Sequence, residues 1–135
     1  MSLMASLHDL WEAEAGLEAL LPAARVFTGL VPAGTSLPYA MLEQPSSSPY
    51  ARTNDSMFRD VGVTVHVWTE TFGEGDAIRE QIEASLANRT IETDDGKVLD
   101  VTVESSGSLR EDDPGDPAWQ FVIQLGLLVS RARVN

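Results

Sequence analysis

The sequence predicts an α+β fold, a single-domain sandwich in which one antiparallel-rich β-sheet carries two α-helices. Three observations favour this class. Valine occupies alternate positions within residues 58–69, which is the period of a half-buried strand. Ile78, Ile82 and Leu86 recur at four-residue intervals, as in an amphipathic helix. Strand-like segments follow one another around these helical segments, an order typical of antiparallel α+β sheets.

The composition limits the classes of function. The 135-residue chain contains no cysteine, and its 9 Lys and Arg against 21 Asp and Glu give a formal net charge of −12. A chain of this length can bury one core without metals or disulfides. The lack of cysteine excludes a disulfide framework, a thiolate nucleophile and zinc sites with sulfur ligands. Duplex binding needs clustered basic residues, whereas the arginines here are scattered, so specific nucleic-acid binding is not expected.

Residues 4–135 are assigned to one domain. Met1, Ser2 and Leu3 precede a second methionine, Met4, and have the form of an expression leader, so they are left out of the fold prediction. The N-terminus lacks the basic and apolar regions of a secretion signal, and no run of about 20 apolar residues could span a bilayer. We therefore expect neither export nor membrane insertion.

The first element is predicted to be a helix over residues 7–21. Ser6 and Asp9 have the spacing of a capping box, and leucines with Trp11 recur on largely one face. Pro22 should end the helix, because the residue before a proline is pushed out of the α region. A short strand over residues 25–28 and a loop over residues 31–37 follow.

A second strand is expected from Pro38 to about Gln44. Residues 45–56 are rich in Ser, Pro, Asn and Asp, and their low content of apolar side chains predicts a mobile, projecting loop. The alternating segment 58–69 is then the next strand. Thr71 and Glu74 have capping-box spacing at the start of the second helix, and Asn88 is suited to end it in a left-handed conformation.

The last third of the chain predicts a hairpin, a polar loop and a long strand. Residues 91–93 and 98–104 flank an Asp-Gly step, which tight turns favour. Leu99, Val101 and Val103 should form the inward face of this hairpin. Residues 105–117 read as a second polar loop, and residues 119–129 alternate as a final strand whose second face is partly apolar, consistent with cover on both sides.

No catalytic, cofactor-binding or metal-binding residue is predicted. His8 and His66 lie outside any HExxH pair or GxSxG turn, so neither is assigned as a base. The carboxylates of Asp112, Asp113 and Asp116 could attract a hard cation, but their spacing is not that of an EF-hand and a solvated turn is the preferred interpretation. Asp94 and Asp95 are interpreted in the same way.

The order of these elements resembles that of bacteriophage tail-completion or tail-terminator proteins, the minor tail proteins that join head to tail. The resemblance covers nearly the whole chain, except for the acidic loop at residues 112–116. It rests on Leu-Leu-Pro at the end of the first helix, on Val-His-Val-Trp in the alternating strand, on the second helix and the final strand, and on the segments Arg25-Val26-Phe27, Val31-Pro32-Ala33-Gly34 and Leu37-Pro38-Tyr39-Ala40-Met41-Leu42.

The resemblance implies a structural virion protein of phage or prophage origin, without an active site or cofactor. Such a protein forms a homo-oligomeric ring, of six subunits in this family, at the head-proximal end of the tail, where it ends tube polymerisation. Its partners are the tail tube protein and the head connector protein, and DNA passes through the ring without specific binding. It would be found in the virion tail, and in the host cytoplasm during assembly.

Two alternatives stay open at this point. One is a head-side connector or stopper protein. The other is a bacterial small-molecule or peptide-binding α+β domain, whose site would be a groove beside the first helix. An enzyme is ranked last, because the sequence offers no base, nucleophile or ligand cluster in a recognisable arrangement.

Overall fold

A computed structural model describes residues 3–52, 56–93, 96–111 and 118–132 and shows one mixed six-stranded sheet in the order β1-β2-β3-β6-β5-β4. β1 is parallel to β2, and all other neighbours are antiparallel. The strands are β1 (Val26–Thr28), β2 (Tyr39–Arg52), β3 (Ser56–Thr69), β4 (Ile91–Thr93), β5 (Gly96–Glu111) and β6 (Ala118–Ala132).

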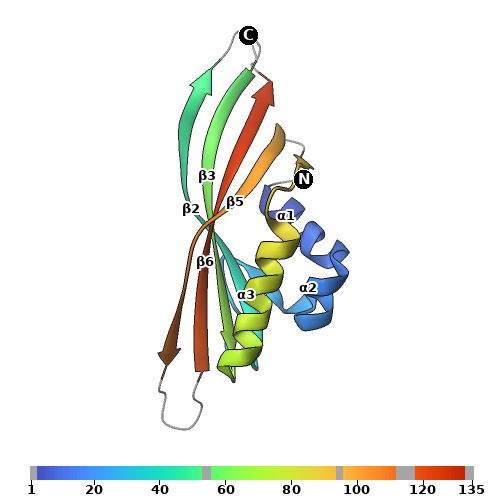
Figure 1. The fold of residues 1–135 in the computed structure, drawn as a ribbon, viewed down its shortest axis with the longest axis vertical. Helices are drawn as coiled ribbons and strands as arrows, with labels where there is room; N and C mark the ends of the chain where they lie inside the picture. Colours follow the sequence, from blue (N-terminus) through green and yellow to red (C-terminus); the bar gives the residue numbers. More distant parts are fainter. Residues whose placement is uncertain (1–2, 53–55, 94–95, 112–117, 133–135) are drawn as a thin grey trace.

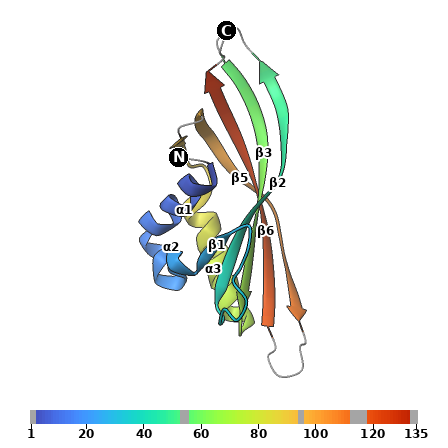
Figure 2. The same cartoon turned by 180° about the vertical axis from the view of Figure 1, so that it is seen from behind.

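The helices α1 (Leu3–Ala13), α2 (Ala15–Leu20) and α3 (Phe72–Leu86) lie on one face of the sheet (Figures 1 and 2), and a 3₁₀ turn at Ala23–Arg25 leads into β1. The predicted α+β class is confirmed, with three α-helices where the sequence indicated two. Among the described residues, no helix is long and apolar enough to cross a membrane.

The prediction of one N-terminal helix over residues 7–21 is wrong, because the chain breaks at Glu14 into α1 and α2. Leu17 follows Trp11 by six positions, so a continuous helix would direct the two side chains about 120° apart. The break allows both side chains to be buried, at 1% and 0% exposure. α1 also begins upstream of the predicted cap, and Leu3 packs against the core.

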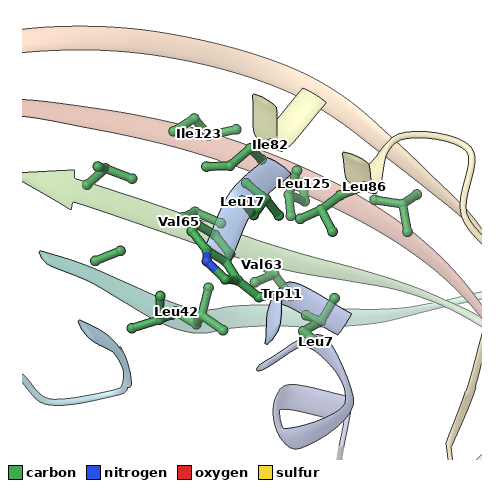
Figure 3. Close-up of a cluster of buried hydrophobic side chains, with 14 of the residues drawn as sticks. Leu7, Trp11, Leu17, Leu42, Val63, Val65, Ile82, Leu86, Ile123 and Leu125 are labelled. Atoms are coloured by element: carbon green, nitrogen blue, oxygen red, sulfur yellow. The ribbon is translucent and has the colours of Figure 1, made fainter. Parts of the chain in front are cut away.

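The core lies between the helices and the two central strands. β3 directs Val61, Val63, Val65 and Val67 toward the helices, and β6 directs Phe121, Ile123, Leu125 and Leu127 to the same side. Trp11 lies beside Val63 and Val65 in Figure 3, and its indole Nε1–H donates to the carbonyl of Leu21 at 2.8 Å. The predicted strand alternation is confirmed on this face.

Both ends of α3 are as the sequence predicts. The backbone N–H of Glu74 donates to Oγ1 of Thr71 at 3.2 Å, which satisfies one of the free donors of the first turn. Asn88 has φ 62°, the left-handed conformation expected after the helix. Ile78, Ile82 and Leu86 are buried against the sheet.

The two predicted polar loops are wrong where the structure describes them. Residues 45–52 and 56 belong to β2 and β3, and residues 105–111 belong to β5. Backbone pairing stabilises these segments, because they extend the ladders of β3 and β6. Residues 53–55 and 112–117, which include Asp112, Asp113 and Asp116, lie outside the described residues.

The β4–β5 hairpin is confirmed, although Asp94 and Asp95 of its turn lie outside the described residues. An irregularity in the register between Val98 and Asp100 changes which residues face the core. Val98 and Val101 are fully buried, whereas Val103 is half-buried. The inward face is therefore built from Val98, Val101 and Val103; the side chain of Leu99 is not among those described.

The second face of β6 is not covered by a described helix. Val122 and Leu128 are half-buried there, and their partners on β3 are His66 and Asp60. The prediction that the final strand is covered on both sides is therefore not met within the described ranges. The sheet has one face under helices and one open face.

Close packing of α3 on β6 generates a stability prediction. A Cβ atom at Gly75 would lie 2.8 Å from Cζ of Phe121 and closer still to two other ring atoms, and this ring is only 1% exposed. Gly75→Ala should therefore lower the free energy of unfolding by about 1–3 kcal/mol, as overpacked cores do. Denaturant unfolding measures the change.

Gly73→Ala is the matched control, since a Cβ atom there meets nothing within 4 Å and the residue lies in the same helical turn. We expect that variant to be neutral or more stable by up to about 1 kcal/mol. Equal effects of the two substitutions would show that the Phe121 ring moves aside.

Candidate assembly surfaces

The two outer long strands each have a stretch of uncovered edge. β1 pairs with β2 only from Ala40 to Leu42, and no described strand pairs with the outer side of β2 beyond that point. β4 pairs with β5 from Gly96 to Val98, and the N–H of Asn88 donates to the carbonyl of Val101 at 2.8 Å. Beyond Val101, no described strand pairs with the outer side of β5.

These uncovered edges lie on opposite sides of the sheet and toward opposite ends of the central strands. The free part of β2, residues 43–52, pairs on its other side with the first half of β3, ending with Arg52 opposite Met57. The free part of β5 pairs with the start of β6, which in turn faces the end of β3 at Thr69. Figure 1 shows the β2–β3 end of the sheet extending past the helices. Unpaired backbone groups in such edges are templates for another strand.

The open face of the sheet carries a cluster of aromatic and polar side chains. The rings of Tyr39 and Trp68 lie 5.0 Å apart, and those of His66 and Trp68 lie 5.7 Å apart. His66 Nε2–H donates to Oε2 of Glu43 at 3.1 Å, and its Nδ1 accepts from the amide of Gln120 at 3.2 Å. His66 thereby links β2, β3 and β6, so it has a structural role on this face.

His8 also has a structural environment. Its Nε2–H lies 2.8 Å from the carbonyl oxygen of Ala23 and 3.1 Å from that of Val26. The imidazole therefore connects α1 to the 3₁₀ turn and to β1, and the sharing of one donor by two acceptors leaves Nε2 unavailable as a base. The structure brings His8 and His66 to different elements and pairs neither with a nucleophile among the described residues.

One group of side chains that the sequence reasoning missed is His8 with Asp9 and Glu12, whose ligand atoms lie within 4.8 Å of one another. The helical spacing i, i+1 and i+4 was its only signal. Nε2 of His8 is already hydrogen-bonded to two carbonyls, and the carboxylates of Asp9 and Glu12 are exposed. Exposed acidic groups on a helix need no ion, so we assign no metal to them.

The surface of both layers is acidic. Glu74, Glu80 and Glu83 are exposed on α3, and Glu43, Asp60 and Glu104 are exposed on the sheet. The charge of Arg79 is partly balanced by Asp76, whose Oδ1 lies 2.8 Å from Nη2 of Arg79, and this hydrogen bond raises the pKa of the guanidinium. Such a surface repels phosphate and other copies of itself.

The comparisons with known proteins agree with this architecture. Residues 5–124 match the family model described as tail completion protein gp17. The chain is similar to a solved chain from a virion of a native gene transfer agent particle, with a TM-score of 0.77, 15% identity and 95% coverage of each chain. A second solved chain gives a TM-score of 0.45 at 18% identity, with 100% and 98% coverage. No curated protein matches the sequence.

The hydrogen bonds of the two histidines generate a second stability prediction. His8→Ala leaves the carbonyls of Ala23 and Val26 without their side-chain donor, and we expect it to lower the free energy of unfolding by about 1–3 kcal/mol. His66→Ala removes the contact with Glu43 on the open face of the sheet. It should lower the free energy of unfolding by less, roughly 0–1 kcal/mol. Urea unfolding with a constant m-value tests the order of the two effects. A larger loss for His66 than for His8 would contradict the assigned roles.

Proposed function

This chain belongs to the tail completion protein gp17 family, and from that premise we propose that it forms a ring at the head-proximal end of the tail. As a structural tail protein, it would end tube polymerisation there and present a surface to the head connector. Its partners would be copies of itself, the tail tube protein and the head connector protein.

The observation that carries the ring is the presence of two different uncovered strand edges on opposite sides of one sheet. A cyclic oligomer uses one heterologous interface repeatedly, so each subunit needs two distinct complementary patches. The outer edges of β2 and β5 meet this requirement, because a neighbour can bind each of them at the same time. An isologous dimer would need only one such patch.

The charge of the chain supports passage of DNA through the ring rather than binding. The exposed carboxylates of Glu43, Asp60 and Glu104 lie on the sheet, and the net charge is −12. An anionic channel repels phosphate and lets the duplex slide. The protein would then act by assembly and not by catalysis, in keeping with the structural bonds made by His8 and His66.

Salt should control formation of this ring. Six chains carry 6 × −12, about −72 formal charges, and like charges repel over the Debye length, which falls from about 30 Å at 0.01 M to about 8 Å at 0.15 M salt. We expect monomers at low salt and a higher-order species as ionic strength and protein concentration rise. Analytical ultracentrifugation, with and without the tail tube protein of the same gene cluster, measures this.

Sodium chloride and potassium chloride at equal ionic strength are the control, because screening depends on ionic strength and not on which monovalent cation is present. A chain that stays monomeric at every salt and protein concentration, even beside tube protein, would rule out the ring. That result would favour a monomeric binding domain.

A further inference from the structure

The outer edge of β2 has an incomplete set of hydrogen-bond donors. The carbonyl of Leu42, opposite Val65 of β3, accepts from the N–H of Gly29 at 2.9 Å and so points away from β3. Backbone groups of an antiparallel strand alternate between the two sides. The backbone N–H and C=O groups of three further β2 residues therefore also point away from β3. These residues lie opposite Val61, Arg59 and Met57 of β3, and they are Ser47, Pro49 and Arg52. Pro49 has no N–H, so this edge offers a carbonyl without its donor at that position.

The outer edge of β5 is complete. The carbonyl of Val101, opposite Leu127 of β6, accepts from Asn88 and so points away from β6. By the same alternation, four β5 residues direct their backbone N–H and C=O groups away from β6, namely those opposite Leu125, Ile123, Phe121 and Trp119. They are Val103, Ser106, Ser108 and Arg110. None is proline, so each offers both an N–H and a C=O beyond the segment that Asn88 and β4 cover.

These two edges also have the polarity that joining them requires. β2 and β5 are separated by three antiparallel steps through β3 and β6, so they run in opposite directions within one subunit. Rotation about a ring axis keeps the component of each strand's direction along that axis. Because the free parts of β2 and β5 lie toward opposite ends of the sheet, the strands must also be tilted to the axis for one to meet the other. The β5 edge of one subunit therefore meets the β2 edge of the next in antiparallel orientation.

We propose, on the basis of the ring function above, that residues 103–110 of β5 pair with the outer edge of β2, residues 43–52, of a second copy of this chain. The sheets of neighbouring subunits then continue into one another by strand addition. The N–H groups of β5 can donate to the outward carbonyls of the β2 edge, including that of Pro49, so this pairing lacks a single hydrogen bond, the one that Pro49 cannot donate. Two β2 edges facing each other would lack two such bonds.

The order of charged residues along the two edges is compatible with this pairing. In antiparallel alignment, the Glu104 end of β5 faces the Arg52 end of β2, and the other end of β5, with Arg110 and Glu111, faces the Glu43 end of β2. Oppositely charged neighbours across strands stabilise a pair, and like charges destabilise it. Two β5 edges in antiparallel contact would also bring Glu104 of one copy toward the oppositely charged Arg110 of the other, but that contact would form a closed dimer instead of a ring.

A proline substitution tests the edge directly. The N–H of Ser108 points away from β6, so Ser108→Pro should keep the monomer folded and lose the salt-induced oligomer, with sedimentation at the monomer value. Ser108→Ala keeps the N–H and is the matched control, which should assemble as the unmodified chain does. Circular dichroism checks that both variants unfold within a few degrees of the parent. Normal assembly of a folded Ser108→Pro variant would overturn the proposal.

Single-cysteine variants identify the occupant, since the chain has no cysteine of its own. Each of Ser47→Cys and Ser48→Cys is mixed with each of Ser105→Cys, Ser106→Cys and Ser108→Cys and oxidised at assembling salt with tube protein present. We expect covalent dimers in at least one mixture and none in any variant alone. Dimers of the β5 variants alone would show the isologous contact and overturn the proposal.

Cross-linking and oligomer formation together distinguish failure of the β2–β5 pairing from failure of the ring. Oligomers that form without any mixed covalent dimer would overturn pairing of β2 with β5 and leave the ring function standing. Failure of the parent chain to form oligomers with tube protein at every salt concentration would overturn both.

Discussion

The difference in length between the two layers governs this structure. α3 has 15 residues and is about 22 Å long at 1.5 Å per residue, whereas the 14 residues of β3 extend about 46 Å. The helices can therefore cover only part of one face of a twisted sheet (Figure 1). The apolar core forms where the layers overlap, and the strands continue beyond it as paired backbone. A second difference in length leaves the sheet edges uncovered, because β1 and β4 have three residues each and lie beside the long strands β2 and β5.

Where the layers overlap, the packing leaves little freedom. The helix approaches β6 so closely at Gly75 that the Phe121 ring occupies the space of a side chain. The N-terminal helices are fixed by polar bonds to backbone, from Trp11 to Leu21 and from His8 to Ala23 and Val26. Arg25 donates to the carbonyl of Pro38 at 2.7 Å and also bonds to Ser36, which holds the loop between β1 and β2. A fixed core of this kind presents its strand edges in a constant geometry.

Charge and edge pairing act in opposite directions in the proposed ring. Unpaired backbone on β2 and β5 favours association, and a complete edge such as that of β5 invites uncontrolled strand addition. The net charge of −12 and Pro49 in the β2 edge oppose such association. Assembly then depends on the partner and on the salt concentration, which suits a subunit that should close on a tail and not polymerise freely.

The sequence by itself determined the elements whose signal is local. The alternation in β3, the Thr71 cap, the left-handed Asn88 and the Asp-Gly hairpin could all be predicted, because each depends on neighbouring residues or on a fixed period. The tertiary structure decided the break at Glu14, where two apolar clusters must face one sheet, and the strand character of residues 45–52 and 105–111. Those polar segments have no apolar period to show them as strands, and only the ladders of β3 and β6, brought to them by the fold, give their backbone groups partners. The uncovered edges were invisible for the same reason: an edge is defined by the strand order of the sheet.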